Sequence, residues 1–589
     1  MNPELLLAHF DRISDAPDAI PRLRSFILDL AVRGKLVDQD SHDEPVSDLL
    51  KRIQAKRERL VEEGGIRKRP HLPKIELSEI PFPLPDTWAW VRLGNVIHLV
   101  SGQHLQPNEY SDREQLGPPY ITGPADFGDN GLVITRYAVV RKAVAKKEQI
   151  LLTVKGAGVG KTAICDLPEV AISRQLMAMT AIEWSQRFLL LTTHRLAEKL
   201  KGSARSLIPG ISREDVDQFV FAFPPVAEQH RIVEKVDELM KLCDGLAVAQ
   251  TQRESRRDRL AASALHHLNT SESAAAFHDN AHFYLNHLPR LTICPEQIQA
   301  LRHAILNLAV RGQLVPQNSG DEPAPKLLKR IQAEKERLVK EGKINREKPP
   351  IPARPDDLGF ELRPGWVAAR ISQVLVELQT GPFGSTLHES DYQKGGVPVI
   401  NPASIKNGRL IPIDKMAVGP AVLERLRTFR LRAGEIVMAR RGEMGRCAVV
   451  SDREDGWLCG TGSLILRLPD CLFPPFLVAL IGSPFVREYL DGSAVGATMQ
   501  NLNQSILLNL VVGLPPLAEQ RRIVAKVDEM MALCDRLEAQ LATTQSKRCR
   551  LLDAILHEAL KESEALNDNS SIGGRDSNMN HALLLQELR

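Results

Sequence analysis

The sequence predicts a mixed α/β (α+β) protein made by tandem internal duplication, in which long helices join two domains of short strands. The first observation is a repeat at an offset of 278 positions. Residues 30–37 (LAVRGKLV) recur as 308–315 (LAVRGQLV), and residues 51–64 (KRIQAKRERLVEEG) recur as 329–342 (KRIQAEKERLVKEG). A period near half the chain length indicates a duplicated domain and excludes a solenoid of short repeats.

The second observation is a later repeat at a larger offset. Residues 224–246 (PPVAEQHRIVEKVDELMKLCDGL) match 515–537 (PPLAEQRRIVAKVDEMMALCDRL) at 291 positions, so the second copy holds a net 291 − 278 = 13 extra residues before this point. Divergent stretches, about 88–222 and 366–513, lie between the repeated blocks. We interpret the repeated blocks as two copies of a segment with one function. The divergent stretches are interpreted as two versions of a segment with a second function.

The first repeated flank is predicted to be helical. Gly64 and Gly342 are expected to end its helices, and the Pro-rich stretches 81–88 and 349–366 are expected to lead, extended, into the divergent regions. Apolar residues recur near helical spacing in both copies: Leu49, Leu50, Ile53 and Leu60, and then Leu327, Leu328, Ile331 and Leu338.

The divergent regions are predicted to contain many short strands. Their apolar segments alternate with polar residues and are rich in β-branched side chains, which suit a pleated sheet. The clearest examples are residues 131–140, 149–154, 435–441 and 463–468.

The second repeated flank predicts the longest helices. A Pro-Pro pair precedes each, and Glu228 or Glu519 falls in the first turn, where an acid suits the helix dipole. At 1.5 Å per residue, a helix of ~40 residues is ~60 Å long. Apolar residues step by three and four: Ile232, Val236, Leu239, Cys243 and Leu246, and then Ile523, Val527, Met530, Cys534, Leu537 and Leu541. Such a seam needs a partner, so we expect the two helices to pair, with packing of each seam on its own domain as the alternative.

These predictions divide the chain into seven segments. Residues 269–282 read as a connector, and the polar tail is expected to be mobile. The segments are an N-terminal helical region (1–87), a first divergent domain (88–223), a central long helix (224–268), a connector with a second helical region (269–365), a second divergent domain (366–514), a distal long helix (515–561) and the tail (562–589).

Composition narrows the class of protein. Hydrophobic residues make up 43% and charged residues 25%, as in an ordinary globular protein. The net charge is only +3, from 76 basic and 73 acidic residues, so any nucleic-acid surface must be local. We find no apolar run of membrane-spanning length, no secretory signal and no Cys-x-x-Cys pair among the eight cysteines. We therefore expect a cytoplasmic protein with reduced thiols.

One glycine-rich segment, KGAGVGKT at 155–162, resembles a nucleotide-binding loop. That loop requires G-x-x-x-x-G-K-S/T, but the residue five before Gly160 is Lys155, so the spacing fails. The corresponding place in the second half is RRGEMGRCAVV at 440–450, which keeps a basic, glycine-rich turn and loses the nucleotide signature. A basic turn that meets DNA phosphates is our interpretation, and a P-loop-like enzyme using Lys161 and Thr162 is the alternative.

Two Pro-Pro motifs invite comparison with the base-gripping motif of adenine methyltransferases. GPPY at 117–120 and FPPF at 473–476 both lack the leading Asp or Asn that accepts the amino hydrogens of the base, and no glycine-rich cofactor loop accompanies them. We interpret both as proline turns. The 16 histidines show no H-E-x-x-H spacing, and no catalytic constellation or metal-ligand set is found.

Positive charge is locally concentrated. Residues 51–74 carry nine Lys or Arg against three acids, and residues 425–446 carry seven Arg against two acids. The first run is explained equally well by a solvated helix face or by a partner subunit. The second lies on predicted strands and a turn of a divergent domain, where contact with phosphates and bases is favoured.

The duplicated helical block, the Pro-rich lead into Trp88 and the repeated PPxAEQ helix resemble the specificity (S) subunit of type I restriction-modification enzymes over nearly the whole chain, to about residue 560. The resemblance implies that the divergent domains are target-recognition domains, each reading half of a bipartite double-stranded DNA sequence. It implies that the repeated helices form an antiparallel coiled coil, set the spacing with pseudo-two-fold symmetry, and dock two methyltransferase (M) subunits. Restriction (R) subunits can join them.

The same resemblance implies a subunit without catalytic residues or cofactors of its own. S-adenosylmethionine, ATP and Mg are expected on the partner subunits, for adenine-N6 methylation or ATP-dependent cleavage. Base edges are read by Arg, Lys, Asn and Gln. The candidate DNA-binding residues are Gln103, His104, Lys155, Lys161, Arg174 and Gln175 in the first domain, and Asn401, Arg440, Arg441, Arg446, Gln500 and Asn501 in the second. A helical scaffold without DNA contacts is a further alternative.

Overall fold

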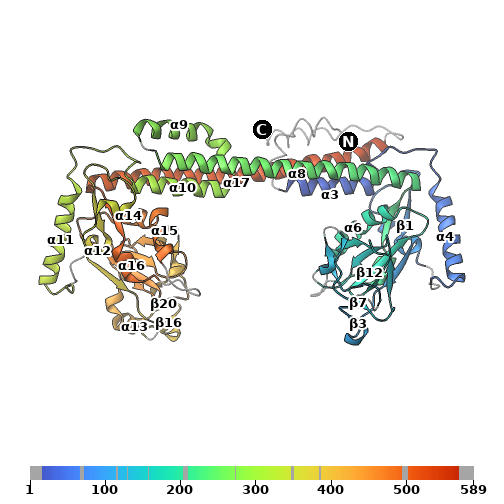
Figure 1. The fold of residues 1–589 in the computed structure, drawn as a ribbon, viewed down its shortest axis with the longest axis horizontal. Coiled ribbons are helices and arrows are strands. Elements are labelled where there is room, and N and C mark those ends of the chain that lie inside the picture. Colours follow the sequence, from blue (N-terminus) through green and yellow to red (C-terminus); the bar gives the residue numbers. More distant parts are fainter. Residues whose placement is uncertain are drawn as a thin grey trace. The chain divides into compact units, whose positions relative to one another are not determined.

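The chain folds into two compact units, which are described separately (Figure 1). Unit 1 comprises residues 1–252 and 545–589, and unit 2 comprises residues 253–544. The computed structural model describes residue 16 and residues 18–66, 72–113, 117–128, 131–156, 158–202, 210–271, 273–346, 351–383, 386–406, 408–493 and 502–568. Two long helices pass from one unit into the other, so each unit contains helical segments from both halves of the chain.

Unit 1 begins with two helices, continues with a domain of short strands, and ends in the first part of a long helix. Its strands lie on one side of the helices α3 and α8, with β3 and β7 farthest from them (Figure 1). The elements are α3 (Ala19–Val32), α4 (Val46–Glu62), η1 (Leu77–Glu79), β1 (Ala89–Arg92), α5 (Leu93–Val96), β2 (Ile97–Ser101), η2 (Pro107–Glu109), β3 (Tyr110–Ser111), β4 (Tyr120–Ile121), η4 (Pro124–Asp126), β5 (Phe127–Gly128), β6 (Gly131–Leu132), β7 (Tyr137–Ala138), β8 (Val144–Lys146), β9 (Ile150–Thr153), β10 (Thr162–Ile164), β11 (Glu169–Ile172), β12 (Leu176–Ala181), α6 (Gln186–Gly202), α7 (Arg213–Asp217), β13 (Val220–Phe223) and α8 (Val226–Asn269).

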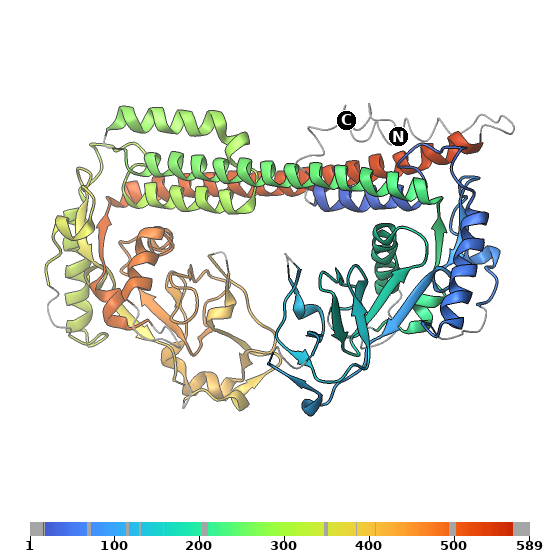
Figure 2. The same cartoon turned by 45° about the vertical axis from the view of Figure 1, so that its right-hand side comes forward.

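Unit 2 repeats this plan, again with the strands to one side of the long helices α8 and α17 (Leu517–Asp568) (Figure 2). Its elements are α9 (Ala274–Leu291), α10 (Pro295–Val310), α11 (Ala324–Lys340), η5 (Pro355–Leu358), β14 (Val367–Arg370), α12 (Ile371–Val374), β15 (Glu377–Thr380), η6 (Glu389–Asp391), β16 (Tyr392–Gln393), β17 (Val397–Ile400), η7 (Pro402–Ser404), β18 (Ile405–Lys406), β19 (Arg409–Leu410), β20 (Ala417–Val418), α13 (Pro420–Arg425), η8 (Arg427–Phe429), β21 (Ile436–Ala439), β22 (Cys447–Val449), β23 (Leu458–Cys459), β24 (Ser463–Arg467), α14 (Pro474–Ile481), α15 (Pro484–Ser493), α16 (Gln504–Asn509), β25 (Val511–Leu514) and α17 (Leu517–Asp568).

The two divergent domains share one strand topology despite their different sequences. The main sheet has the order β10-β9-β12-β2 in unit 1 and β22-β21-β24-β15 in unit 2. A smaller sheet in each domain contains one parallel pair, β4–β11 or β17–β23. The first and last strands of each domain pair antiparallel, β1 with β13 and β14 with β25. This shared topology confirms the mixed α/β fold and the tandem duplication.

Burial explains why the strand core formed in both copies. All four residues of β9 and all four of β21 are buried, which suits the central strands of a sheet that is covered on both faces. Their runs, ILLT and IVMA, are almost wholly apolar, so burying them removes a large apolar area from water. The strand predicted over 131–140 is wrong, because β6 and β7 cover only two residues each and the segment between them is mostly exposed.

In unit 1, the beginning of α8 packs onto its own domain. Ile232, Val236 and Cys243 belong to the same apolar core as Val91 of β1 and Phe188 of α6. Leu246, the last predicted seam residue, is 39% exposed. The alternative of packing on its own domain therefore holds for this part of the seam.

In unit 2, the end of α8 and the beginning of α17 both belong to the core around α10, which includes Leu265 and Cys534. The helices α8 and α10 run in the same direction where they meet. Gln297, near the start of α10, donates to Asp258, and Arg311, just after its end, donates to the carbonyl of Asn269. The α17 contacts run the opposite way, since Arg302 pairs with Asp535 and Asp321 pairs with Arg522. Within unit 2, these segments of α8 and α17 are thus antiparallel.

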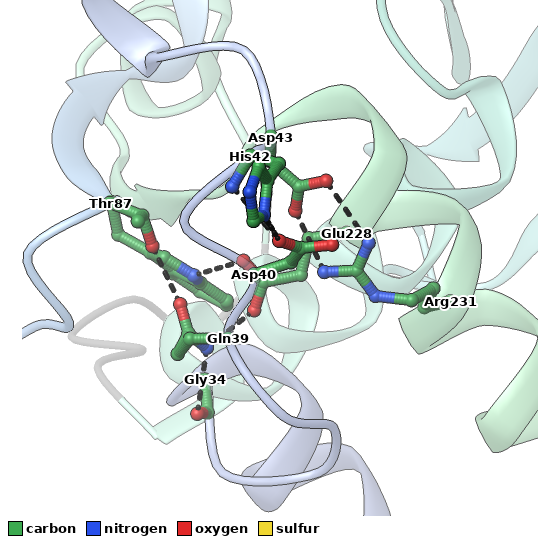
Figure 3. Close-up of polar contacts among 9 residues, drawn as sticks. Gly34, Gln39, Asp40, His42, Asp43, Thr87, Glu228 and Arg231 are labelled. Carbon is green, nitrogen blue, oxygen red and sulfur yellow. Dashed lines mark hydrogen bonds and ion pairs between the residues drawn. The ribbon is translucent and has the colours of Figure 1, made fainter.

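Side-chain contacts of the buried Glu228, in the PPxAEQ motif, hold the start of α8 in place (Figure 3). The Glu228 carboxylate accepts hydrogen bonds from Gln39 Nε2 (2.6 Å) and Trp88 Nε1 (2.9 Å). Arg231 pairs with Asp43 at 2.7 Å. The contacts tie the loop after α3, the entry to the strand domain and the long helix to one another.

Gln229, the next residue of the motif, binds the strand domain itself. Its Nε2 donates to the carbonyl of Pro224 (2.8 Å), and its Oε1 accepts from the Ser185 N–H (2.9 Å). Gln520 repeats both contacts with Pro515 and Phe473, and Arg522 repeats the ion pair with Asp321. The motif recurs because each copy attaches a strand domain to a long helix.

Two other predictions need correction. The stretch 269–282, predicted as a connector, contains the first half of α9, because Ser273 caps this helix by accepting from the Ala276 N–H and an alanine-rich run follows. The distal helix does not end near residue 561 but continues to Asp568. The rest of the predicted mobile tail, 569–589, lies outside the described residues. No helix in the described part of the chain is long and apolar enough to cross a membrane.

Candidate nucleic-acid interface

In unit 1, three turns meet at one edge of the strand domain. They are the segment after β2, the turn between β9 and β10, and the turn between β11 and β12. The Gly102 N–H donates to the carbonyl of Leu176 (2.9 Å), the Gln103 N–H to Ile172 (3.0 Å) and the Val154 N–H to Gln175 (2.7 Å). These bonds bring all six candidates of the first domain onto one surface, and all six are exposed: Gln103, His104, Lys155, Lys161, Arg174 and Gln175.

Glycine permits this close meeting of turns. A Cβ on Gly102 would lie 2.0 Å from the carbonyl oxygen of Ser173, and a Cβ on Gly158 would lie 2.3 Å from Pro124 Cγ. Gly156 and Gly160 have φ of 91° and 86°, a backbone region that other residues rarely adopt. The glycines of KGAGVGKT therefore serve a tight hairpin turn.

The structure contradicts the alternative of a nucleotide-binding loop. In such a loop, the Lys and Thr open a helix whose N-terminal N–H groups face the phosphate. Here Thr162 opens the strand β10, which pairs antiparallel with β9. A cavity of about 460 Å³ in unit 1 is lined by Arg33, Phe82, Trp90 and other residues, and neither Lys161 nor Thr162 lines it.

Unit 2 builds the same edge with equivalent hydrogen bonds. The Gly381 N–H donates to the carbonyl of Ser463 (2.9 Å), as Gly102 does to Leu176. The Arg440 N–H donates to Gly462 (2.8 Å), as Val154 does to Gln175.

Two further bonds set the register of the basic turns. The Ala439 N–H donates to Arg446 at 2.8 Å and the Thr153 N–H to Lys161 at 2.8 Å. Arg441 is therefore the structural equivalent of Lys155, and Arg446 is the equivalent of Lys161. The predicted correspondence of the two basic turns is confirmed.

The cations of this second edge differ in availability. Arg441 is exposed. Arg440 is half-buried, and its Nε donates to the carbonyl of Leu502 (3.0 Å), so its guanidinium is partly used inside the domain. Arg446 is half-buried with Nε 3.8 Å from Glu443, which also binds Arg487 at 2.8 Å. Arg441 is thus the most exposed residue of the three.

A carboxamide lies against the same pair of turns in both domains, but from opposite sides. In unit 1, a Cβ on Gly123 would lie 2.5 Å from Gln175 Oε1. In unit 2, a Cβ on Gly460 would lie 2.1 Å from Asn401 Oδ1. In each domain, a glycine in one turn leaves space for a carboxamide from the facing turn. The carboxamide comes from the turn between β11 and β12 in unit 1, and from the segment after β17 in unit 2. Gln500 and Asn501, the remaining candidates, lie outside the described residues.

One exposed residue of this edge is not among the residues predicted from the sequence. Gly102 and Gly381 are equivalent, and the buried Leu105 and Leu387 that follow them occupy matching small apolar clusters. Two residues separate the first pair and five separate the second, so unit 2 has a longer tip. That tip holds Phe383, which is 65% exposed. The sequence did contain a signal for this residue, because Phe383 is a single aromatic residue between Gly381-Pro382 and Gly384.

In both basic runs, some of the cations pair with nearby acids. In the first, Lys51 pairs with Asp48 and Arg52 with Glu44 along α4, as expected of a solvated helix face. In the second, Arg425 pairs with Asp391, away from the turn that carries Arg441. Exposed pairs of this kind contribute little to stability.

Metal-ligand clusters and reactive thiols are two kinds of site for which the described side chains give evidence. Among them, no cluster of three or more His, Cys, Asp or Glu could hold a metal ion. Burial raises the pKa of Cys447 to about 12 and raises the pKa of Cys459 further, so neither thiol is a ready nucleophile. The seam cysteines Cys243 and Cys534 are buried in apolar cores, and burial raises the pKa of each.

The fold and this edge define a class of protein: a duplicated β-rich domain, mounted on long helices, that exposes a basic, amide-bearing edge twice. A family model for the type I restriction modification DNA specificity domain matches residues 70–252 and 365–544. The chain belongs to this family, the specificity subunits of type I restriction-modification systems.

Individual relatives cover nearly the whole chain. It is 30% identical over 577 residues to the specificity subunit of the type I restriction enzyme EcoEI of Escherichia coli, which covers 92% of this chain and 94% of that protein. The EcoAI specificity subunit of Escherichia coli is 30% identical over 575 residues, with 92% and 94% covered. Among solved structures, the HsdS subunit from Thermoanaerobacter tengcongensis aligns with a TM-score of 0.39 at 20% identity, over 82% of this chain and 99% of that one.

Proposed function

We propose that each strand domain of this chain reads one half of a bipartite double-stranded DNA target, and that the chain positions partner subunits for adenine-N6 methylation or ATP-dependent cleavage. One observation carries the proposal: the same meeting of turns is built twice on one backbone plan, with different side chains at equivalent places. Lys155 and Lys161 stand where the second domain has Arg441 and Arg446.

The chemistry of the edge suits nucleic acid. Lys and Arg bind phosphates and guanine edges, and carboxamides such as those of Gln175 and Asn401 match the adenine edge in the major groove. Two readers with different side chains need not read the same sequence, so the target need not be palindromic.

Catalysis is assigned to partner subunits. We infer two methyltransferase subunits that bind S-adenosylmethionine, with restriction subunits that use ATP and Mg, and no cofactor on this chain. Support comes from family membership and from the long helices α8 and α17, which continue well beyond the strand domains they attach. The basic helix α4, with its largely exposed charged face, is a candidate contact for such a partner.

The test is to co-express the chain with its methyltransferase partner and map N6-methyladenine genome-wide. A bipartite motif is expected. Replacing residues 88–222 with the matching domain of a relative should change one half-site and leave the other intact. A helical scaffold without DNA contacts predicts no change of motif after the swap. Tight ATP binding to the isolated chain that depends on Lys161 would favour the enzyme alternative instead.

A further inference from the structure

Phe383 is an apolar side chain placed in water at the edge that carries the DNA-binding candidates. It is 65% exposed. A single exposed apolar residue is common on protein surfaces and carries no meaning by itself. The position of Phe383 distinguishes the second domain. The equivalent tip of the first domain holds only Gln103 and His104, so it has no apolar aromatic side chain.

Described residues at both ends of the tip make contacts with the domain or with each other. Gly381 is bonded through its N–H to Ser463, and a Cβ there would lie 2.3 Å from the carbonyl oxygen of Gly460. Leu387 is 4% exposed and packs with Val399 and other apolar residues. The Phe383 carbonyl accepts from the N–H groups of Thr386 (2.8 Å) and Leu387 (3.2 Å). The exposed Phe383 is therefore tied through its backbone to Thr386 and to the buried Leu387.

The turn between β23 and β24, which holds the start of the tip, also contacts the turn that carries Arg441. The Gly462 carbonyl accepts from the Arg440 N–H at 2.8 Å, and a Cβ on Gly462 would lie 3.7 Å from Arg441 Cδ. The tip with Phe383 and the turn with Arg441 therefore flank the turn between β23 and β24 on its two sides, at one edge of the sheet. A partner that binds Arg441 through a phosphate or a guanine brings its neighbouring groups toward Phe383.

The chemistry of phenylalanine limits what it can recognise there. The ring has no hydrogen-bond donor or acceptor, so it cannot read amide or amino groups of bases. The apolar feature that DNA offers in the major groove is the 5-methyl group of thymine, and phenylalanine is among the side chains that contact it. Bidentate contacts of Arg with guanine and of Asn with adenine are made in the major groove, so base reading by Arg441 and Asn401 would place Phe383 at that groove too.

We propose that Phe383 is a specificity-determining residue that reads the 5-methyl group of a thymine in the half-site of the second domain. The inference rests on the proposed function. It predicts that this half-site contains a T·A pair, and that the first domain, with His104 at the equivalent tip, reads no thymine methyl by this route.

The experiment uses the chain in complex with its methyltransferase partner, after the methylation motif has been mapped. Each thymine of the second half-site is replaced in turn by deoxyuridine, which lacks only the methyl group. We expect one replacement to weaken binding by the wild-type complex about fourfold, the value of one buried methyl group. Phe383→Ala should lose about the same factor on the natural duplex and lose nothing more on that deoxyuridine duplex.

Matched controls separate contact from folding. Phe283 on α9 is also exposed, at 43%, so Phe283→Ala removes the same side chain elsewhere in unit 2 and should leave binding unchanged. Phe383→Leu should retain part of the discrimination between thymine and uracil, because it keeps an apolar contact.

Three outcomes overturn the inference while leaving the proposed function intact: a second half-site without any T·A pair, a wild-type complex indifferent to every replacement, or losses from Phe383→Ala and deoxyuridine that simply add. A rise in 2-aminopurine fluorescence at a neighbouring step, abolished by Phe383→Ala, would show a wedge between bases and equally overturn it. Absence of any bipartite motif would instead sink the proposed function.

Discussion

The two strand domains differ in sequence far more than in structure. Their main sheets have the same strand order, and their edges are held by equivalent backbone bonds, such as Gly102 to Leu176 and Gly381 to Ser463. The differences gather in the side chains of the edge: Lys155 against Arg441, Gln175 against Asn401, and a two-residue tip against a five-residue tip with Phe383. A backbone that is fixed by its own hydrogen bonds can change its surface chemistry freely, which is what a pair of readers for two different half-sites requires.

The largest expected effect comes from disturbing the shared backbone. Gly102→Ala places a Cβ 2.0 Å from a backbone oxygen, and Gly381→Ala places one 2.3 Å from its counterpart. Backbone atoms cannot yield as a side chain can, so each change should destabilise its own domain by about 3 kcal/mol. The measurement is urea unfolding, with limited proteolysis to show which domain opens first.

The matched control for these two variants is Gly245→Ala. Gly245 lies on an exposed part of α8 with no atom within 4 Å of an added Cβ, so alanine should stabilise the helix by up to about 1 kcal/mol. Equal stability of Gly102→Ala and the wild type would show that the turns do not meet as described.

A smaller effect is expected from the cations of the two edges. The double variants Lys155→Ala/Lys161→Ala and Arg441→Ala/Arg446→Ala should each weaken DNA binding roughly tenfold, the value of one or two charge-assisted contacts. If each cation meets a phosphate, the slope of log K against log salt should flatten by up to about 2.

The second pair of cations is expected to matter less at low salt, because Glu443 already lies 3.8 Å from Arg446. Binding titrations of the complex at several salt concentrations check both values. Lys526→Ala, on α17 beside Glu529, serves as a control outside the edge. An unchanged slope in both double variants would remove the basic turns from the DNA interface.

Sequence alone could predict the duplication, the long helices and the equivalence of the two basic turns, since these depend on local patterns. The antiparallel segments of α8 and α17 in unit 2 needed the structure, because heptad spacing does not say which of two partners a seam meets. The helix α9 was missed because the stretch 269–282 is rich in small and polar residues, although the complete helix is amphipathic.

The edge was only partly predictable for a different reason. Polar residues in loops marked Lys155 and Arg441, but the exposed Phe383 is conspicuous only when Gly381 and Leu387 are aligned with Gly102 and Leu105 through their contacts. Arg440 was among the predicted DNA-binding residues, yet the hydrogen bond from its Nε to the carbonyl of Leu502 turns part of its guanidinium into the domain. Such partners belong to residues distant in sequence, so no local pattern reveals them.

The smallest expected effect concerns Glu228, which joins the first strand domain to α8. Burial raises the pKa of its carboxyl above the ordinary value, although hydrogen bonds from Trp88 and Gln39 oppose the shift. A raised pKa means that the folded state binds the proton more tightly than the unfolded state does. The stabilising effect of protonation is therefore complete below the unfolded pKa and is lost as pH rises toward the folded pKa.

Glu228→Gln should remove this pH dependence from unit 1 while changing stability at neutral pH by no more than about 1 kcal/mol. The glutamine loses the hydrogen bond from Gln39 but also avoids the cost of burying a charge, and the two effects offset each other. Glu519→Gln is the matched variant in unit 2, where burial likewise raises the pKa of Glu519. Unfolding measured from pH 4 to pH 8 should show a flatter profile for each single variant and the flattest for the double variant. A profile in Glu228→Gln as steep as that of the wild type would mean that another group titrates, and that the two junctions are equivalent in sequence but not in electrostatics.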